Sequence, residues 1–490
     1  MSHESRLPDI VVILTDDQGC WAMGCAGNPE IRTPNLDRLA TTGVRFESFF
    51  CASPVCSPAR ASLLTGRIPS SHGIHDWLRK GNIDHDDDRG IEYLRGMPGY
   101  TDVLAQRGYV CGLSGKWHLG DSLRPQKGFT YWYAHQTGGS NYHGAPMIRD
   151  GVPYEEPRYV TDAITDGALE FLEERRGEDR PFYLSVHYTA PHSPWVNQHP
   201  PDIVDSYDAC AFTSCPDVPP HPWQIASAPR GTGSERREIL KGYFAAVTAM
   251  DANVGRIVDW LEEHDRRGNA IVFFLSDNGM NMGHHGLYGK GNATFPLNMY
   301  DTSVKVPAIL SAPGRARQGA VEEGLYSQYD FLPTLADYLD LAVPQPHRLP
   351  GRSFAPILRG QGLPGREDVV VFDEYGPVRM IRDRSWKYVH RYPYGPHELC
   401  QLAEDPNEEH NLIRDPACRA VVEPMKARLD AFFVEYGDPA RDGVREPVRG
   451  SGQLDLAGPA GEGREAHAGP LPYVDGQGRP REEGYQPPER

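Results

Sequence analysis

The chain has 490 residues, of which 39% are hydrophobic and 24% are charged, so it can bury a large core and lacks the composition of a disordered protein. Asp and Glu number 67 against 50 Lys and Arg, and the formal net charge is -17. This charge excludes a general nucleic-acid or anionic-membrane binder, because such proteins need a basic face. A local basic cluster for an anionic substrate stays open.

The N-terminal region and the cysteines bear on compartment and cross-linking. The only apolar run near the N-terminus, residues 10–14, has the length of a strand and is too short for a signal peptide or a membrane span. We therefore expect a cytoplasmic protein with no membrane partner. The nine cysteines form no Cys-x-x-Cys pair, so we predict neither structural zinc nor a disulfide framework, with Cys210 and Cys215 as the one candidate pair.

Short apolar runs alternate with helical patterns along residues 1–365, which is typical of helices covering a mostly parallel sheet. The predicted strands cover residues 9–14, 109–113, 182–186, 270–275 and 306–310. The predicted helices cover residues 35–42, 101–107, 160–175, 235–264 and 329–339. We expect an α/β catalytic domain, a large mostly parallel sheet sandwiched by helices.

The sequence pattern changes after residue 365. Short strands at residues 369–372, 378–381 and 385–392, followed by a helix at 420–436, predict a smaller antiparallel subdomain over residues 366–440. Residues 441–490, rich in Gly, Pro, Arg and Glu, predict an extended or disordered tail unless they lie on the body. The Pro-rich stretch 194–233 reads as a long functional or mobile loop.

Polar side chains follow several predicted strands. Asp16 and Asp17 follow the first strand, and Asp277 and Asn278 follow the strand at 270–275. Each pair alone is a weak signal, because acidic residues after strands are often caps or turn residues. Together they supply only oxygen ligands, which calcium and magnesium prefer. Because binding sites of open α/β sheets lie at the carboxyl ends of the strands, we predict a cation site there.

Basic and imidazole groups follow the same pattern. Lys116 and His118 are alternate residues, so on an extended segment they would point to the same side. His192 lies between two prolines, and Lys290 ends a glycine-rich loop that also holds His284 and His285. Each taken singly is best interpreted as a surface or packed side chain. Their shared position after strands indicates a common site.

Cys56 taken alone is best interpreted as a buried thiol, but the residues around it indicate a different role. Cys56-Ser-Pro-Ala-Arg60, followed by Leu64-Thr-Gly-Arg67, resembles the signature of the type I, formylglycine-dependent sulfatases of the alkaline phosphatase superfamily. Further segments resemble other motifs of this family in chain order: Asp16-Asp17, Thr33-Pro-Asn-Leu-Asp37, Gly115-Lys-Trp-His118, Ala190-Pro-His192, Ser276-Asp-Asn-Gly279, Gly286-Leu-Tyr-Gly-Lys290 and residues 399–412. The resemblance spans roughly residues 9–415.

The resemblance implies an alkaline phosphatase-like fold and hydrolysis of a sulfate monoester. It implies that Cys56 is oxidised to formylglycine by a transiently bound formylglycine-generating enzyme. It also implies one divalent cation per chain, which is Ca²⁺ with Mg²⁺ as the alternative. The ligands of this cation would be Asp16, Asp17, the modified Cys56, Asp277 and Asn278. The hydrated aldehyde on this cation would be the nucleophile.

The remaining roles also come from the resemblance. Lys116 and Lys290 would hold the sulfate oxygens, Arg60 the hydrated aldehyde, His192 would be the general acid and His118 a base. His284 departs from the family, where Glu is common, so His284 and His285 are left out. His187, after the strand at 182–186, is interpreted as a structural histidine.

We expect the substrate to be a saccharide sulfate or an aryl sulfate, with choline sulfate as a further alternative. Residues 131–143 (YWYAHQTGGSNYH) offer rings and polar groups suited to sugars. His75, Asp76, Trp77 and Arg79 either touch the organic part of the substrate or pack within a loop.

Two alternatives remain. A formylglycine-dependent phosphonate or phosphate ester hydrolase would use the same nucleophile, although Asn278 stands where two-zinc relatives carry histidine, which favours one metal. A noncatalytic binder of sulfated glycan would leave Cys56 unmodified.

Overall fold

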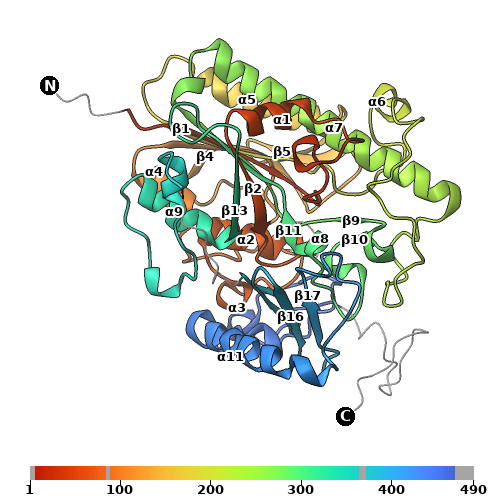
Figure 1. The fold of residues 1–490 in the computed structure, drawn as a ribbon. Coiled ribbons are helices and arrows are strands. Elements are labelled where there is room, and N and C mark those ends of the chain that lie inside the picture. The colour runs from red at the N-terminus through yellow and green to blue at the C-terminus, as the bar shows by residue number, and fades with distance from the viewer. Residues whose placement is uncertain (1–5, 84–88, 363–370, 469–490) are drawn as a thin grey trace.

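The computed structural model describes residues 6–83, 89–362 and 371–468 and contains a large eleven-stranded sheet (Figure 1). Its centre is parallel throughout. The central strands, in spatial order, are β8 (Ala270–Ser276), β1 (Asp9–Thr15), β7 (Phe182–His187), β3 (Val110–Lys116) and β4 (Phe129–His135). The bounds of β8, β1, β7 and β3 confirm four predicted strands, whereas β4 was not predicted. The large mostly parallel sheet is confirmed with them.

The two edges of this sheet are mainly antiparallel. One edge adds β5 (Ala145–Arg149) and β6 (Val152–Glu156) beside β4. The other adds β2 (Val44–Phe50), β11 (Lys305–Val306), β12 (Ala308–Ser311) and β13 (Ala320–Ser327), of which only β13 runs parallel to β2. The strand predicted at residues 306–310 is divided between β11 and β12.

Both faces of the sheet are buried, as the unbroken apolar runs require. Alternate residues of β1 enter different cores: Ile10, Val12 and Leu14 one, Val11 and Ile13 the other. One face is covered by α1 (Pro34–Thr41), α5 (Val160–Glu174) and α7 (Gly233–Glu263). The opposite face is covered by α2 (Cys56–Thr65), α4 (Tyr100–Gln106) and α9 (Phe331–Tyr338), as Figure 1 shows.

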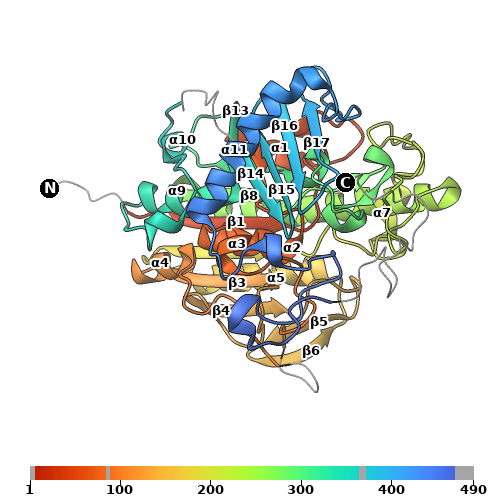
Figure 2. The ribbon, with the colours of Figure 1, turned by 90° about the horizontal axis from the view of Figure 1, so that it is seen from below.

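A second, antiparallel sheet follows in the C-terminal part. Its strands, in order, are β14 (Val371–Tyr375), β15 (Val378–Arg382), β16 (Trp386–Arg391) and β17 (Glu398–Gln401). The long helix α11 (Arg419–Tyr436) packs along β15 and β16 (Figure 2). The predicted small sheet is confirmed; the first residues of the strand predicted at 369–372 lie outside the described residues.

Segments without regular structure lie on this framework. The Pro-rich stretch 194–233 contains one short helix, α6 (Pro201–Asp205). Residues 441–468 lie on the body of the protein, with short 3-10 turns at Gly443–Arg445 and Gly458–Gly461, whereas residues 469–490 lie outside the described part. All nine cysteines, Cys210 and Cys215 included, are free.

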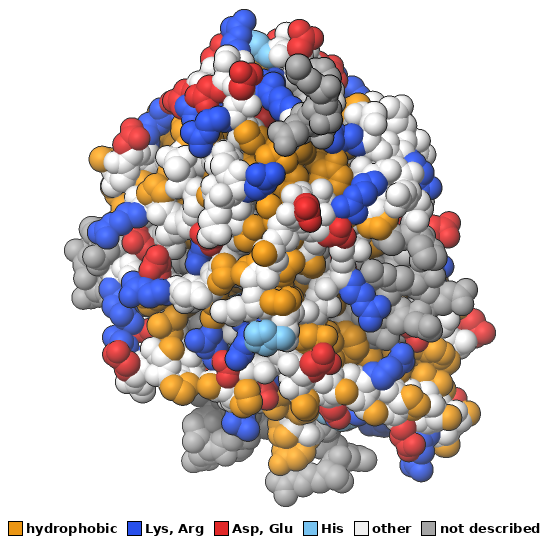
Figure 3. Space-filling view, turned by 90° about the vertical axis from the view of Figure 1, so that its left-hand side faces the viewer, with side chains coloured by type: hydrophobic (Ala, Val, Ile, Leu, Met, Phe, Trp, Pro, Cys, Tyr) orange, Lys and Arg blue, Asp and Glu red, His pale blue; other side chains and the backbone are white. Residues whose placement is uncertain are grey.

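Charged side chains of both signs lie on the surface (Figure 3). Figure 3 shows basic and acidic side chains interspersed with apolar ones on one face of the protein. Within the described part of the chain, no helix combines the length and the hydropathy needed to cross a bilayer.

A buried ion cluster fixes the small sheet to the large one. Lys387 on β16, 1% exposed, lies 2.7 Å from Asp301 on α8 (Asp301–Val304) and 2.5 Å from Glu408. Lys387→Met leaves these carboxylates without their ammonium partner and is expected to lower the free energy of unfolding by about 3 kcal/mol or more. Urea unfolding followed by circular dichroism measures this change.

The matched control is Lys426→Met on α11, whose pair with Asp430 lies on the surface and is 2.5 Å long. This substitution is expected to cost less than about 1 kcal/mol. Equal losses for the two variants would show that the buried cluster does not hold the sheets together.

Candidate active site

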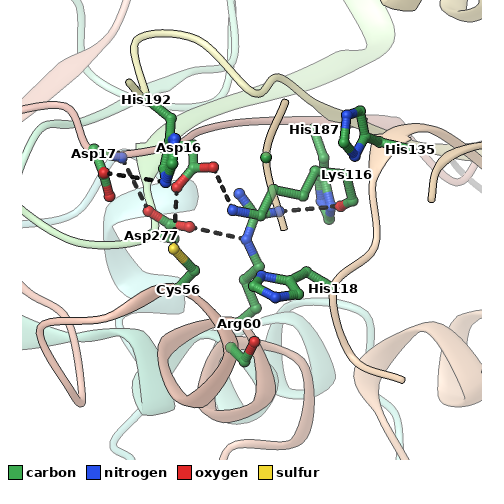
Figure 4. A network of polar contacts seen from close by, with 12 residues as sticks. Asp16, Asp17, Cys56, Arg60, Lys116, His118, His135, His187, His192 and Asp277 are labelled. Carbon is green, nitrogen blue, oxygen red and sulfur yellow. Dashed lines mark hydrogen bonds and ion pairs between the residues drawn. The ribbon is translucent and has the colours of Figure 1, made fainter. Parts of the chain in front are cut away.

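Acidic side chains converge where β1 and β8 end. The strands pair in parallel register with Thr15 opposite Ser276, so the residues that follow them leave the sheet at the same edge. Asp16, Asp17 and Asp277 each have a carboxylate oxygen within 4.8 Å of the others, and all are buried. The sequence-predicted acidic residues therefore form one cluster (Figure 4).

Cys56 is the first residue of α2, which begins after the extended residue Val55. Its Sγ lies 3.4 Å from Asp16 Oδ1 and 2.8 Å from Lys290 Nζ. Burial, followed by the charge of Asp16, raises the pKa of the thiol to about 12. Because the thiolate is the reactive form of cysteine, the unmodified thiol is a poor nucleophile at neutral pH.

Every carboxylate of the cluster has a buried cationic partner. Lys116 pairs with Asp16, and Lys290 pairs with Asp17. Arg60, one helical turn after Cys56, donates from Nε to Asp277 Oδ2 at 2.9 Å and from Nη1 to the backbone oxygen of Lys116 at 3.1 Å. Figure 4 shows Cys56 and Arg60 pointing from their helix toward the carboxylates.

These pairs set the protonation of the cluster. Burial favours the neutral acid, but Lys116 and the other nearby cations hold the pKa of Asp16 well below its usual value. Burial and the charge of Asp16 together raise the pKa of Asp277 to about 7, against the opposing effect of Arg60. A buried set of acids and cations with shifted pKa values is typical of functional sites.

The donor set fits a hard divalent cation. Asn278 donates from Nδ2 to Asp17 Oδ1 at 2.8 Å, while its Oδ1 is buried and has no hydrogen-bond partner among the described residues. A buried amide oxygen left without a donor is costly, and a cation would satisfy it. With the carboxylates of Asp16, Asp17 and Asp277 it makes an oxygen-only set, suited to Ca²⁺ or Mg²⁺.

The two histidines predicted for catalysis lie at this centre with fixed rings. His192 Nδ1 lies 2.6 Å from the backbone oxygen of Ser193, and its Nε2 lies 3.7 Å from Asp17 Oδ2. His118 Nε2 lies 3.0 Å from the backbone oxygen of Leu78, and its Nδ1 is buried without a partner among the described residues. Burial, reinforced by Lys116, holds the pKa of His118 well below its usual value.

The predicted geometry of Lys116 and His118 is wrong. Lys116 is the last residue of β3, and the backbone turns at His118, whose φ is 50°. The segment is therefore not extended across the pair, and strand alternation does not orient the two side chains. Both side chains still reach the centre. Lys116 contacts Asp16 directly, and His118 lines the cavity together with Cys56.

A cavity of about 530 Å³ opens above the cluster. Cys56, His118, His192 and Lys290 all contribute to its wall, so four of the sequence-predicted residues share one cavity. Further lining residues are Trp77, Arg79, Asn82, Asn292 and residues 137–141. Of these, Asn82 and Asn292 carry no sequence signal beyond their nearness to motifs.

The structure also places the other residues that the sequence analysis considered. His75 and Asp76 are buried in packing, unlike Trp77 and Arg79 beside them. His187 Nδ1 contacts the backbone oxygen of Lys116 at 3.1 Å, and burial lowers its pKa to about 3, as for a structural histidine. The rings of the adjacent pair His284 and His285 lie against Trp21 and Tyr300, away from the lining of the cavity.

Sequence reasoning included His135, the last residue of β4, only within the stretch 131–143 and gave it no role of its own. Its Nδ1 lies 2.8 Å from the backbone oxygen of Thr137, and its Nε2 lies 2.9 Å from Ser140 Oγ. Burial lowers its pKa to about 4, so the ring is neutral and fixes residues 137–141 along the cavity. Its position at a strand end was the available signal.

The fold and this centre define a class: an α/β protein whose strand ends gather acids and cations around the first residue of a helix. The model of the sulfatase family matches residues 8–341, and the model described as N-sulphoglucosamine sulphohydrolase, C-terminal, matches residues 283–435. The chain therefore belongs to the sulfatase family and is a sulfuric ester hydrolase.

Individual relatives agree with this assignment. The N-acetylglucosamine-6-O-sulfatase of Bacteroides thetaiotaomicron is 26% identical over 492 residues, covering 84% of this chain and 83% of the relative. The N-acetylgalactosamine-6-sulfatase of Canis lupus familiaris is 30% identical, covering 73% and 67%. A protein solved in complex with its substrate D-glucosamine-2-N,6-O-disulfate shares the fold, with a TM-score of 0.74 at 23% identity and coverage of 89% and 99%.

Cation binding is testable without an activity assay. Adding Ca²⁺ to chelator-treated protein is expected to raise the melting temperature, because a ligand at a hundred times its Kd stabilises the fold by about 2.7 kcal/mol. Asp17→Asn is expected to reduce this shift. As a matched control, Asp405→Asn changes a second acidic cluster, in which Glu409 and His410 are exposed, and is expected to preserve the shift. An undiminished shift in Asp17→Asn would contradict the assigned site.

Proposed function

We propose that the protein hydrolyses a sulfate monoester of a saccharide, using a formylglycine made from Cys56 and one calcium ion. The observation that carries this proposal is the position of Cys56, between Asp16 and Lys290 at the wall of the cavity. The relatives named for N-acetylglucosamine and N-acetylgalactosamine sulfates support a saccharide, as does a cavity lined by Trp77 and polar side chains.

In this proposal the cation is held by Asp16, Asp17, Asp277, Asn278 and the modified residue 56. A hydrated aldehyde there supplies a hydroxyl nucleophile, and the cation supplies positive charge that favours the deprotonated hydroxyl. The choice of calcium over magnesium follows the family resemblance, since an oxygen-only set suits both ions.

The basic side chains neutralise the sulfate oxygens, which otherwise repel a nucleophile. Lys290 lines the cavity, and Lys116 reaches the same cluster through Asp16. Each preorganised charge contributes about 3 kcal/mol to transition-state stabilisation in a water-poor site. Arg60 Nη2 is buried without a partner among the described residues, which suits it to hold the hydroxyl groups of the hydrated aldehyde.

The ring contacts of the two histidines support a proton-transfer role for each. The backbone oxygen of Ser193 accepts a hydrogen bond from His192 Nδ1, so protonated His192 presents a second N–H, at Nε2, and donates it to the leaving oxygen. The backbone oxygen of Leu78 likewise accepts from His118 Nε2, which leaves Nδ1 as the basic nitrogen. His118 therefore takes the proton whose removal restores the aldehyde and expels sulfate.

The proposed reaction is tested by a substrate panel: N-acetylglucosamine 6-sulfate, N-acetylgalactosamine 6-sulfate, choline sulfate, a steroid sulfate, nitrophenyl sulfate and phenyl phosphonate. We expect the fastest turnover with a saccharide sulfate and a loss of about a thousandfold or more in Cys56→Ala, as for other removed nucleophiles. Faster turnover of the phosphonate would contradict the substrate class. Mass spectrometry of the peptide containing Cys56 tests the nucleophile, and a free thiol in protein from the native host would contradict it.

The role of His192 is tested by the leaving group. His192→Ala is expected to lower kcat for a saccharide sulfate by about a hundredfold or more, because an alkoxide leaves poorly without a general acid. Nitrophenolate needs no proton, so turnover of nitrophenyl sulfate is expected to fall much less. Equal losses on both substrates would argue against general acid catalysis; His410→Ala, an exposed histidine, is the control.

A further inference from the structure

A C-terminal segment outside both family matches crosses the rim of the cavity. The matches end at residue 435, and residues 450–468, here called the strap, lie beyond them. The strap runs beside the loop of residues 73–80, which enters the cavity at Trp77, Leu78 and Arg79. In Figure 2 the dark blue chain continues from α11 back over the body of the protein.

Gln453 is the centre of this contact and is fully buried. Its backbone N–H donates to the oxygen of Trp77 at 2.7 Å, and its oxygen accepts from the N–H of Arg79 at 2.9 Å. Its side-chain Oε1 accepts from the N–H of His75 at 2.8 Å, and Nε2 donates to the oxygen of Gly73 at 3.0 Å. Gln453 alone is thus hydrogen-bonded to the rim loop from Gly73 to Arg79.

The strap also fixes the indole of Trp77. Trp77 Nε1 donates to the backbone oxygen of Gly450 at 3.1 Å. Gly452, with φ of 103°, approaches so closely that a Cβ there would lie 2.7 Å from Arg79 Cβ and 3.0 Å from Trp77 Cε2. Its N–H donates to Asp76 Oδ2 at 2.9 Å. Glycine at this position lets the strap support the ring and the backbone of the rim together.

The same contact continues to the catalytic centre through Leu78. The N–H of Leu78 donates to Ser57 Oγ at 3.0 Å, next to Cys56, and its oxygen accepts from His118 Nε2. Gln453 forms a parallel bridge with Leu78. The strap therefore positions both the rim and one carbonyl that orients His118.

We propose that the strap completes a binding subsite for the sugar ring of the leaving group, with Trp77 as its aromatic platform. This inference rests on the proposed saccharide sulfatase function. The indole is partly exposed at the cavity, while Ser140, Asn141 and Asn292 offer polar groups in the same wall. Asn292 also contacts the strap, since a Cβ on Gly450 would lie 2.7 Å from its Cβ. An apolar ring face with polar groups beside it matches the chemistry of a pyranose.

The test compares Trp77→Ala with the wild-type enzyme on N-acetylglucosamine 6-sulfate and N-acetylgalactosamine 6-sulfate. We expect KM for the faster sugar to rise about tenfold, which corresponds to roughly 1.4 kcal/mol of lost ring contact, with kcat little changed. Inhibition by inorganic sulfate, which occupies only the sulfate-binding part, is expected to keep its Ki. Trp77→Phe, which retains a ring, is expected to recover part of the affinity.

Gln453→Ala tests the strap itself. It is expected to raise KM in the same direction and to lower kcat as well, because Leu78 and with it His118 are less firmly held. Glu465→Ala, an exposed strap residue, is the matched control, and thermal unfolding verifies that each variant is folded.

The outcomes separate the two proposals. Wild-type protein that hydrolyses no sugar sulfate but turns over aryl sulfate would overturn the saccharide function and the subsite together. Sugar turnover that Trp77→Ala leaves unchanged would overturn the subsite alone. A parallel loss of sulfate inhibition in a folded Trp77→Ala variant would also overturn it, because the ring would then support the sulfate-binding part instead.

Discussion

The site depends on the balance of charge among buried groups. Asp16, Asp17 and Asp277 lie within a few ångströms of one another and away from water, and each is paired with a lysine or arginine. Burying ions in this way costs more than packing apolar side chains of similar volume. The cluster is therefore poorly explained as a source of stability and well explained by chemistry on an anionic ester, for which cations at fixed positions are needed.

The framework brings these charges together by simple geometry. Parallel strands send their carboxyl ends to one edge, and the register of β1 with β8 places Asp16 and Asp277 side by side. Helix α2 begins beneath that edge, so Cys56 at its first position and Arg60 one turn later face the same cluster. The spacing of the Cys-x-x-x-Arg motif is thus the spacing of a helix.

Local pattern was enough for four of the five central strands and for the acidic pairs that follow two of them, because burial on both faces leaves a plain apolar run and turn chemistry marks its end. It failed at His118, where tertiary contacts impose a positive φ on a residue expected in extended backbone. Local sequence pattern also could not predict the contacts of the strap, since the contact of Gln453 with His75 joins residues 378 positions apart. No periodicity or local motif encodes such a pairing.

The two halves of the cavity tolerate change differently. At the charged end around Cys56, altering one charge leaves its partner buried and uncompensated, at a cost of several kcal/mol, so this half has little freedom. At the rim, the strap holds the loop through backbone hydrogen bonds and the close approach of Gly452, which do not depend on most strap side chains. Change in strap side chains other than Gln453 can therefore reshape the wall near Trp77, while Gln453 keeps Leu78, and through it His118, in place.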